Sequence, residues 1–555
     1  MRWKSRCRWG YSPSVIDLRD FWTRLPSSAR AGMFLSMLAV TWIALGQTWF
    51  FVGPSEWDDV LYFEIASVPS PMAELRNRYV HIWLLRIFEQ IFTPRALAAG
   101  LYANVLVVLL AMVCFAFGRA AAGTACGIIA ALMMPIDVSV LKWISAPYVD
   151  PCLALWSGCA ILAATLAFER DQSRIRIGWL LFAGVGSYLA IKSKETGLAI
   201  LPVVALIIMQ HAKQWQSSMV WLGGFVIGWL ALVGLDGLFT DATWPWRSAD
   251  WGIYFGAETL QPRRSPLSSS VRFDAHYLQQ VVRAGHLTVT LLAIAGVIRG
   301  FKSNAFVRSA ALWWGASVGF GSLMAFLRPG LFADERYLAS FAPAMVVLAA
   351  YEAVCLYRGA EERDWKEILI AIAIIVGVTW LPFMHLTLDL VGRETDRTPR
   401  ALFYLFPVAI VVLFTILKIA RARYVVIAAL VALGALTVAS NVSESRKHVL
   451  EARARMEPWK RLSVLMDRAN VQLVRWRLPK KPFATYRVRR RLRTWSRRPA
   501  KIINVMNVKE LPSATDRAWV FALGRHDKRF DKLGWIHVIE GFDHDGWWSV
   551  YRPPL

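Results

Sequence analysis

Long apolar stretches recur along most of this chain, and they restrict its fold more than any other feature. Between residues 31 and 440 about thirteen blocks are predominantly apolar, and most approach the roughly 20 residues that a helix needs to cross a bilayer. The 555-residue chain is 56% hydrophobic, with a mean hydropathy of +0.40, which is rare for a soluble globular protein. The sequence therefore predicts an all-α polytopic membrane protein. The predicted spans are 31–53, 97–118, 122–140, 151–168, 177–191, 197–209, 219–239, 286–298, 310–327, 337–357, 368–383, 401–419 and 424–440.

The net charge of +25 fits a membrane partner better than nucleic acid. Basic residues gather in the segment 1–30, in short connections between apolar blocks and in the tail. Those in alternate connections define the cytoplasmic side by the positive-inside rule. The segment 1–30 leads into an apolar run without a small-residue cleavage site, which indicates an uncleaved first span. We expect an integral membrane protein of the bacterial inner membrane, with its active site facing the periplasm or exterior.

The chain divides into three predicted parts. Residues 1–30 form a basic cytoplasmic segment, and 31–440 form the transmembrane domain with a first outer loop at 54–96. Residues 441–555 form a small extracytoplasmic α/β or α+β domain, because runs such as 518–523 and 535–539 suit strands. The six cysteines lie mostly inside or beside apolar spans, so we predict core residues and no disulfide scaffold.

The first outer loop carries the acidic residues Asp58 and Asp59, with Tyr62 close behind. Ser55 can cap a helix, with Asp58 three residues on, and Glu56 and Asp59 then favour the positive end of its dipole. Asp58 and Asp59 can also accept a proton from an acceptor hydroxyl as a sugar leaves its phosphate. The two interpretations are compatible. Paired carboxylates also suit a divalent cation, so metal dependence stays open, although no His/Cys metal cluster is visible.

A second group of candidates lies at the outer ends of later spans. Asp150 precedes Pro151, which is a helix-start signal, yet an acid at membrane depth is by default a functional candidate. Outward-facing cations follow at Lys192, Lys194, Arg328 and Arg336. Each can simply snorkel to the interface, but together they can hold the phosphate of a lipid carrier. Tyr337 adds a hydroxyl donor.

Four short islands resemble the integral-membrane type C glycosyltransferases, especially the aminoarabinose (lipid A) transferases and the related protein O-mannosyltransferases. Asp59 stands where these enzymes have Glu, and Arg78 lies near the position of a family Lys. The resemblance covers most of the chain through the order of its motifs. The islands are Asp58–Ala66, Val149–Trp156, Ser193–Pro202 and Arg336–Pro343.

The resemblance implies transfer of a sugar from a polyprenyl-phosphate carrier to a lipid, glycan or protein acceptor, with inversion. It implies catalytic roles for Asp58, Asp59 and Asp150. Membrane lipids are expected partners and nucleic acid is not. A ligase or polymerase of lipid-linked oligosaccharide, a transporter or flippase of a lipid-linked sugar, and a membrane scaffold remain alternatives. The residues expected to bind substrate are Tyr62, Arg78, Lys192, Lys194, Arg336 and Tyr337.

Overall fold

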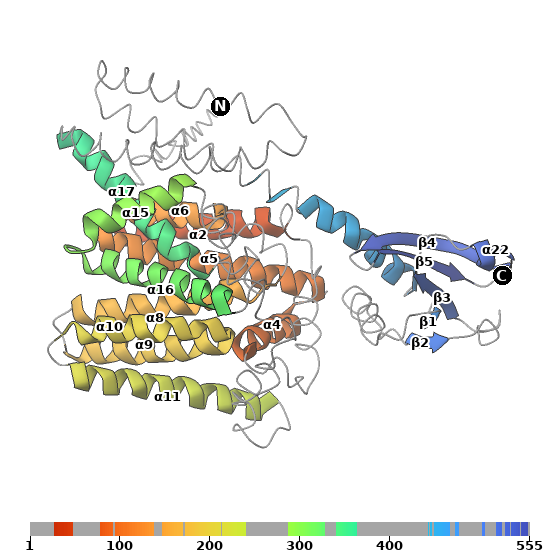
Figure 1. The fold of residues 1–555 in the computed structure, drawn as a ribbon, viewed down its shortest axis with the longest axis horizontal. Helices are drawn as coiled ribbons and strands as arrows, with labels where there is room; N and C mark the ends of the chain where they lie inside the picture. Colours follow the sequence, from red (N-terminus) through yellow and green to blue (C-terminus); the bar gives the residue numbers. More distant parts are fainter. Residues whose placement is uncertain are drawn as a thin grey trace, which may run out of the picture.

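The computed structural model describes a helical bundle and a smaller C-terminal unit (Figure 1). The helices are α2 (Ser27–Leu45), α4 (Tyr79–Ile91), α5 (Arg95–Ala122), α6 (Thr124–Met133), α8 (Asp150–Glu169), α9 (Ser173–Ser193), α10 (Ile200–Met209), α11 (Gln214–Phe239), α15 (Leu287–Gly300), α16 (Ala305–Leu327) and α17 (Ala342–Glu362). The described residues are 27–47, 51, 78–92, 95–137, 147–169, 173–211, 214–239, 287–327, 340–362, 442, 445–446, 449–466, 472–476, 502–505, 518–523, 528–532, 534–543 and 546–552.

Ten of the predicted apolar blocks coincide with helices of the bundle. Within the described ranges, four helices are long and apolar enough to cross a membrane by length and composition, namely α5, α8, α9 and α11. The described part therefore supports an integral membrane protein. The predicted spans 368–383, 401–419 and 424–440, and the segment 1–26, lie outside the described residues.

Two elements differ from the sequence prediction. The block predicted as a span at 122–140 contains α6, which ends at Met133 and passes into a short 3-10 helix, Met134–Ile136, that contains Pro135. Proline removes a backbone donor, so it helps to end the α-helix at this point. The other difference is α4, which lies inside the predicted first outer loop. Its apolar positions have helical spacing, and it buries Val80, Ile82 and Leu85.

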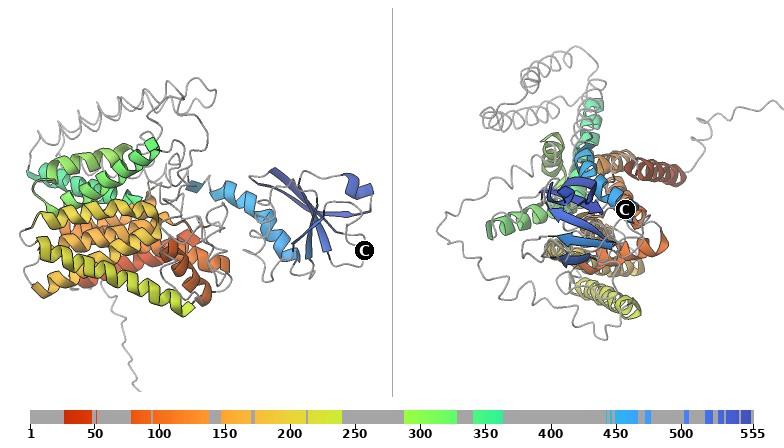
Figure 2. Two further views of the ribbon diagram at one scale, coloured as in Figure 1. Left: turned by 60° about the horizontal axis from the view of Figure 1, so that its bottom comes forward. Right: turned by 90° about the vertical axis from the view of Figure 1, so that its right-hand side faces the viewer.

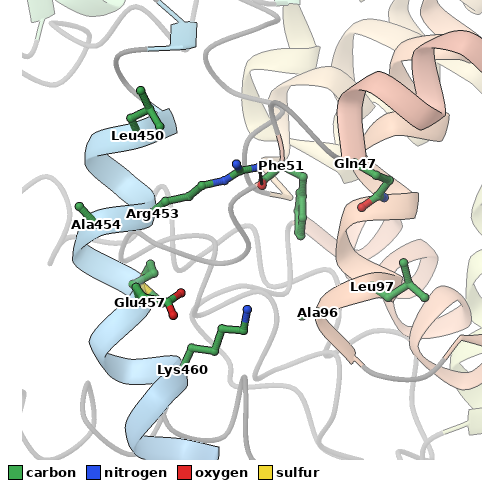
Figure 3. A pocket seen from close by; sticks show the side chains of 10 residues that line it. Gln47, Phe51, Ala96, Leu97, Leu450, Arg453, Ala454, Glu457 and Lys460 are labelled. Carbon is green, nitrogen blue, oxygen red and sulfur yellow. Dashed lines mark hydrogen bonds between the residues drawn. The ribbon is translucent and has the colours of Figure 1, made fainter. Parts of the chain in front are cut away.

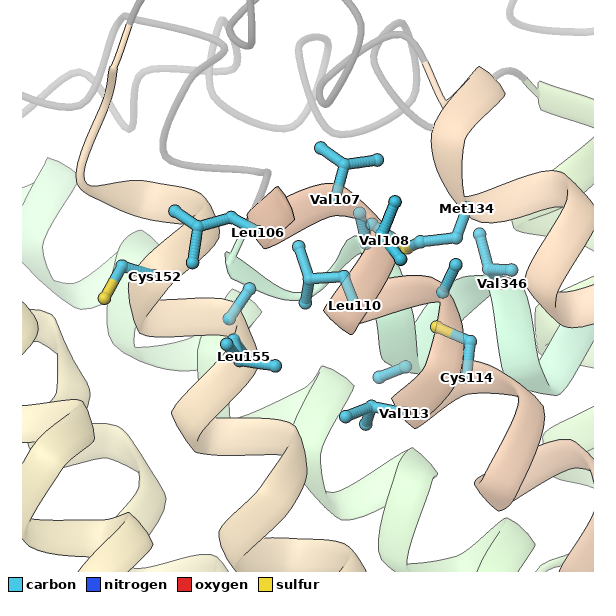
Figure 4. Packing of buried hydrophobic residues seen from close by; sticks show 14 of the residues in the cluster. Leu106, Val107, Val108, Leu110, Val113, Cys114, Met134, Cys152, Leu155 and Val346 are labelled. Atoms are coloured by element: carbon cyan, nitrogen blue, oxygen red, sulfur yellow. The ribbon is translucent and has the colours of Figure 1, made fainter. Parts of the chain in front are cut away.

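The interior of the bundle is centred on α8. About 78% of the most apolar window of α8 is buried, against 17% for α11, which lies at the edge of the bundle (Figure 1). Helices α5, α9, α10, α16 and α17 pack against α8. Figure 4 shows Leu106 and Leu110 of α5, Leu155 of α8 and Val346 of α17 in the shared core. The outer helices thus leave apolar faces for lipid, while α8 has little surface left to expose.

Two facing glycines bring α9 and α11 into close contact. A Cβ at Gly184 would meet the backbone of Trp221 and lie 2.6 Å from the Phe225 nitrogen, and a Cβ at Gly224 would meet the backbone of Leu181. Close backbone approach through small residues is the usual way in which membrane helices associate. This pair therefore joins α11 to α9, which carries part of the candidate site.

The C-terminal unit is a mixed five-stranded sheet beside a helix of residues 449–466 (Figure 2). The strand order is β2-β1-β3-β5-β4; β1 runs parallel to β2 and β3, and β5 runs antiparallel to β3 and β4. The predicted strand runs at 518–523 and 535–539 correspond to β3 and the first part of β4. The strands and one short helix are β1 (Gln472–Trp476), β2 (Ile502–Val505), β3 (Ala518–Leu523), α22 (Lys528–Lys532), β4 (Ile536–Asp543) and β5 (Gly546–Arg552).

Aromatic side chains hold the 449–466 helix against the sheet. Trp459 lies 4.3 Å from Trp548 and 5.6 Å from Phe521 between ring centroids. All three are almost fully buried, and large buried aromatic rings contribute strongly to packing. The helix is thus part of the C-terminal unit. It is also the element that approaches the bundle, through Arg453.

Candidate functional site

A buried ion pair joins the first turn of α8 to the end of α9. Lys194 Nζ donates to Asp150 Oδ1 at 2.6 Å, and the two side chains are 3% and 2% exposed. Two charges are taken out of water at considerable cost, so such pairs persist where their geometry is good or where they serve a function. Both residues were predicted as site residues from the sequence. Lys194 was expected to bind the carrier phosphate, and its ion pair with Asp150 was not predicted.

The chain reaches this pair through a tight turn after α9. Lys194 has an extended backbone and accepts a hydrogen bond at its carbonyl from Gly197 N, 2.9 Å away, where the 3-10 helix Glu195–Ala199 begins. A Cβ at position 197 would lie 2.5 Å from the Ala190 carbonyl oxygen. Glycine at 197 therefore allows the turn to fold back over α9 and present Lys194 to α8.

The second carboxylate oxygen of Asp150 has an unused acceptor capacity. Asp150 Oδ2 is buried and has no hydrogen-bond partner among the described residues. A buried acceptor without a donor costs free energy, and an ionised carboxylate has room for several donors. The pair thus retains an acceptor function on Asp150 Oδ2.

The neighbourhood of the pair is polar and closely packed. Lys192, two residues before Lys194 at the end of α9, is buried, as are Tyr148 and Ser193. Cys152, two residues after Asp150, lies with its sulfur 3.4 Å from Ser193 Oγ. Lys192 was predicted as a substrate-binding residue, and the structure places it on the same helix end as Lys194.

A hydrogen bond connects this end of the bundle to α4, and sequence reasoning missed its role. His81 Nδ1 lies 2.7 Å from Tyr102 Oη, with both residues almost fully buried. The imidazole also interacts with the backbone of Pro147, three residues before Asp150, and burial and the nearby Arg78 lower the pKa of His81 to about 3. His81 is therefore neutral at physiological pH. It holds α4 and α5 beside the Asp150 segment.

Arg78 is the remaining described candidate. It precedes α4, is partly buried, and lies close enough to His81 to influence its charge. Its backbone is not extended and its side chain makes no helix cap. Arg78 therefore lies near His81, at the start of α4. The other predicted residues, Asp58, Asp59, Tyr62, Arg328, Arg336 and Tyr337, lie outside the described residues.

The opposite end of the bundle carries a different set of polar contacts. Arg299 on α15 forms a bidentate pair with Glu352 on α17, at 2.9 and 3.2 Å, and Asn304 and Arg358 donate to the last carbonyls of α5. Their sequence positions belong to the basic connections predicted as cytoplasmic. The Asp150 region therefore lies at the other end of the bundle from Arg299 and Arg358, and the orientation in the membrane stays a prediction.

No metal site emerges from the ranges that the structure describes, since they contain no group of three or more His, Cys, Asp or Glu side chains placed to hold an ion. The predicted pair Asp58 and Asp59 lies outside those ranges.

Comparison with known proteins gives a likeness in fold. No family model and no curated protein matches the sequence. The solved structure of ArnT from Cupriavidus metallidurans in the apo state has a TM-score of 0.57 at 16% identity, covering 94% of this chain and 98% of that chain. The same protein bound to undecaprenyl phosphate gives 0.59 at 16% identity, with 95% and 98% covered. The resemblance to integral-membrane type C glycosyltransferases is thus confirmed for the fold.

A more distant likeness is to the archaeal oligosaccharyltransferase AglB from Archaeoglobus fulgidus in complex with an inhibitory peptide and a dolichol-phosphate. Its TM-score is 0.46 at 12% identity, over 90% of this chain and 69% of that chain. A likeness at this level supports no further argument.

Proposed function

We propose that this protein is a glycosyltransferase that takes a sugar from a polyprenyl-phosphate carrier and transfers it to a lipid, glycan or protein acceptor on the extracytoplasmic face. The observation that carries the proposal is the buried Asp150–Lys194 pair. Both residues lie in motif islands quoted for the resemblance, and the fold is shared with ArnT over nearly the whole chain. The polyprenyl carrier enters by analogy with the undecaprenyl phosphate bound to that protein.

The chemistry requires a base, a positioned acceptor and stabilisation of a leaving phosphate. In an inverting transfer, the acceptor oxygen bonds to the anomeric carbon while the bond from that carbon to the phosphate oxygen breaks. The hydroxyl proton passes to a carboxylate, which we assign to Asp58, and the electron pair of the broken bond stays on the phosphate. Asp59, its acidic neighbour, is assigned to orient the acceptor hydroxyl toward Asp58.

Asp150 is suited to position the acceptor. Its Oδ1 is held by Lys194, which fixes the carboxylate, and its Oδ2 is left to accept a hydrogen bond. Because the site is shielded from water, one well-placed acceptor there has a larger effect than at an exposed surface. This role needs no change in the protonation of Asp150.

Lys194 has a different part from the one expected from sequence. Its charge is already shared with Asp150 at 2.6 Å, so any action on the phosphate comes from the pair and not from an isolated cation. We propose that Lys194 bridges the carboxylate and the leaving phosphate, while Lys192, Arg336 and Tyr337 complete the phosphate site. Tyr62 and Arg78 lie on the first-loop side of the same region in this proposal.

The test is a transfer assay in membranes supplied with a labelled polyprenyl-phosphate sugar. Asp58→Asn is expected to lower the rate by about 10²–10⁴-fold, the usual effect of a general base, with the protein still present at wild-type abundance. Glu56→Gln in the same loop is the matched control and should retain transfer. Full activity of Asp58→Asn would remove the assigned role of Asp58.

The mass of the transferred unit separates the alternatives. One sugar supports the proposed enzyme, and a block of sugars would indicate a ligase or polymerase instead. Movement of intact lipid-linked sugar across the membrane without release of polyprenyl phosphate would indicate a transporter. None of the described contacts favours these alternatives over the proposed transfer.

A further inference from the structure

A cavity separates the membrane bundle from the C-terminal unit. It has a volume of about 640 Å³ and lies between the end of α2, the first turn of α5 and the 449–466 helix (Figure 3). None of its described lining residues belongs to the Asp150–Lys194 site. The described lining residues are Gln47, Phe51, Ala96, Leu97, Leu450, Arg453, Ala454, Met456, Glu457 and Lys460.

The wall formed by the 449–466 helix is cationic. Arg453 and Lys460 are seven residues apart, so they lie on one face of the helix. Arg453 Nη2 donates to the Phe51 carbonyl at 3.0 Å, which anchors the guanidinium at the edge of the cavity. The acidic residue between them, Glu457, accepts a hydrogen bond from Arg461 Nε at 3.1 Å. This wall therefore suits a phosphate group, for which Arg and Lys are the usual ligands.

The facing wall is largely apolar and continues along α2. Met33, Met37 and Val40 are exposed and recur at intervals of four and three residues, which places them on one helix face. Gln47 lies seven residues after Val40 and lines the cavity, so the stripe leads toward it. Exposed apolar residues on a membrane helix are covered by lipid chains. A cationic recess at the end of such a stripe matches an amphiphile with an anionic head group.

Exposed apolar side chains also flank the cavity on both sides. Leu97 is 40% exposed and Leu450 is 50% exposed, one on the bundle and one on the 449–466 helix. An entrance with such sides admits a molecule laterally from the bilayer. Phospholipids are the most abundant amphiphiles there, and mass action favours the abundant ligand.

We propose that this cavity binds an anionic phospholipid of the surrounding leaflet. The phosphate lies between Arg453 and Lys460, and an acyl chain follows the exposed face of α2. The lipid then fills the space between the bundle and the C-terminal unit and joins the two. This site is separate from the proposed carrier site and does not depend on the proposed transfer reaction.

The test uses the full-length protein in nanodiscs that contain either phosphatidylglycerol or phosphatidylcholine, followed by native mass spectrometry of retained lipid. The wild type is expected to retain phosphatidylglycerol in preference to phosphatidylcholine. The double substitution Arg453→Gln/Lys460→Gln should weaken phosphatidylglycerol retention about 30-fold, from roughly 1 kcal/mol for each basic residue. Arg455→Gln is the matched control, because Arg455 is a basic residue of the same helix and does not line the cavity.

A second substitution tests the cavity without changing its charge. Ala454→Trp should fill the recess and release the lipid while Arg453 and Lys460 remain, which separates occupancy from simple attraction to a basic surface. Equal retention of the two phospholipids by the wild type would overturn the proposal. An equal loss in Arg455→Gln would overturn it too, as would retention of a polyprenyl phosphate that phosphatidylglycerol does not displace.

Discussion

Breaking the Asp150–Lys194 pair on one side only should destabilise the protein more than removing both charges. The pair is 2.6 Å long and its side chains are 2–3% exposed. Lys194→Met leaves a buried carboxylate without its cation, and Asp150→Asn leaves a buried ammonium without its anion. Each single substitution should therefore cost about 3–5 kcal/mol of unfolding free energy. The double variant removes both charges and should cost less than either single one.

The magnitude can be checked by unfolding purified variants in mixed micelles with increasing SDS, monitored by tryptophan fluorescence. Arg461→Gln supplies a comparison, because its pair with Glu457 is 69% and 47% exposed and should be worth no more than about 0.5 kcal/mol. The reasoning would be refuted if the two single effects were below about 1 kcal/mol each, or if they simply added in the double variant.

The same cycle separates stability from chemistry. The double variant Asp150→Asn/Lys194→Met should recover most of the wild-type unfolding free energy and still fail to transfer sugar, because it lacks the carboxylate and the ammonium that the reaction uses. A folded double variant with wild-type transfer would show that the pair is structural only.

Three further outcomes are expected. Gly184→Leu should separate α9 from α11 and lower the free energy of unfolding by at least about 2 kcal/mol. Gly178→Leu should be tolerated, because nothing lies within 4 Å of the Cβ position at this glycine. SDS unfolding measures both effects. The folded pKa of His81, about 3, lies below its ordinary value, so its contribution to stability is fully present above about pH 6.5 and falls by roughly 1.4 kcal/mol for each pH unit below that value. His81→Gln should flatten this slope between pH 6.5 and 5, and an unchanged slope would contradict the assignment. Because we assign His81 and Tyr102 to position the Asp150 segment, Tyr102→Phe should keep the fold and still reduce sugar transfer. In the membrane assay the substitution should lower kcat and leave KM unchanged.

The sequence predicted the bundle well where apolar length alone decides the structure. The span at 151–168 is α8, and Asp150 begins it as a helix-start signal predicts. The prediction that both residues lie at the outer ends of spans also indicated that Asp150 and Lys194 belong to one region, although they are 44 residues apart. Pairing of the two side chains could not be read from the sequence, because it depends on the tight turn at Gly197 and on antiparallel packing of α8 and α9.

Other features depended on contacts that no local pattern reveals. The 13 residues of α4 are too few to span a membrane, so the length of the apolar block did not predict this helix. The helical spacing of its apolar residues was the available indication. No local pattern links His81 to its partner Tyr102, which is 21 residues away on α5. The block at 122–140 was predicted as one span because most of its residues are apolar. That prediction gave no weight to Pro135, which helps to end α6.

The most direct test is the analysis of glycans and lipid-linked sugars after deletion of the gene and complementation. Deletion should raise the pool of polyprenyl-phosphate sugar and remove one sugar unit from the acceptor, and the wild-type gene should restore both. The stable double variant Asp150→Asn/Lys194→Met should restore neither. Unchanged lipid-linked sugars and glycans on deletion, or full restoration by that variant, would contradict the account.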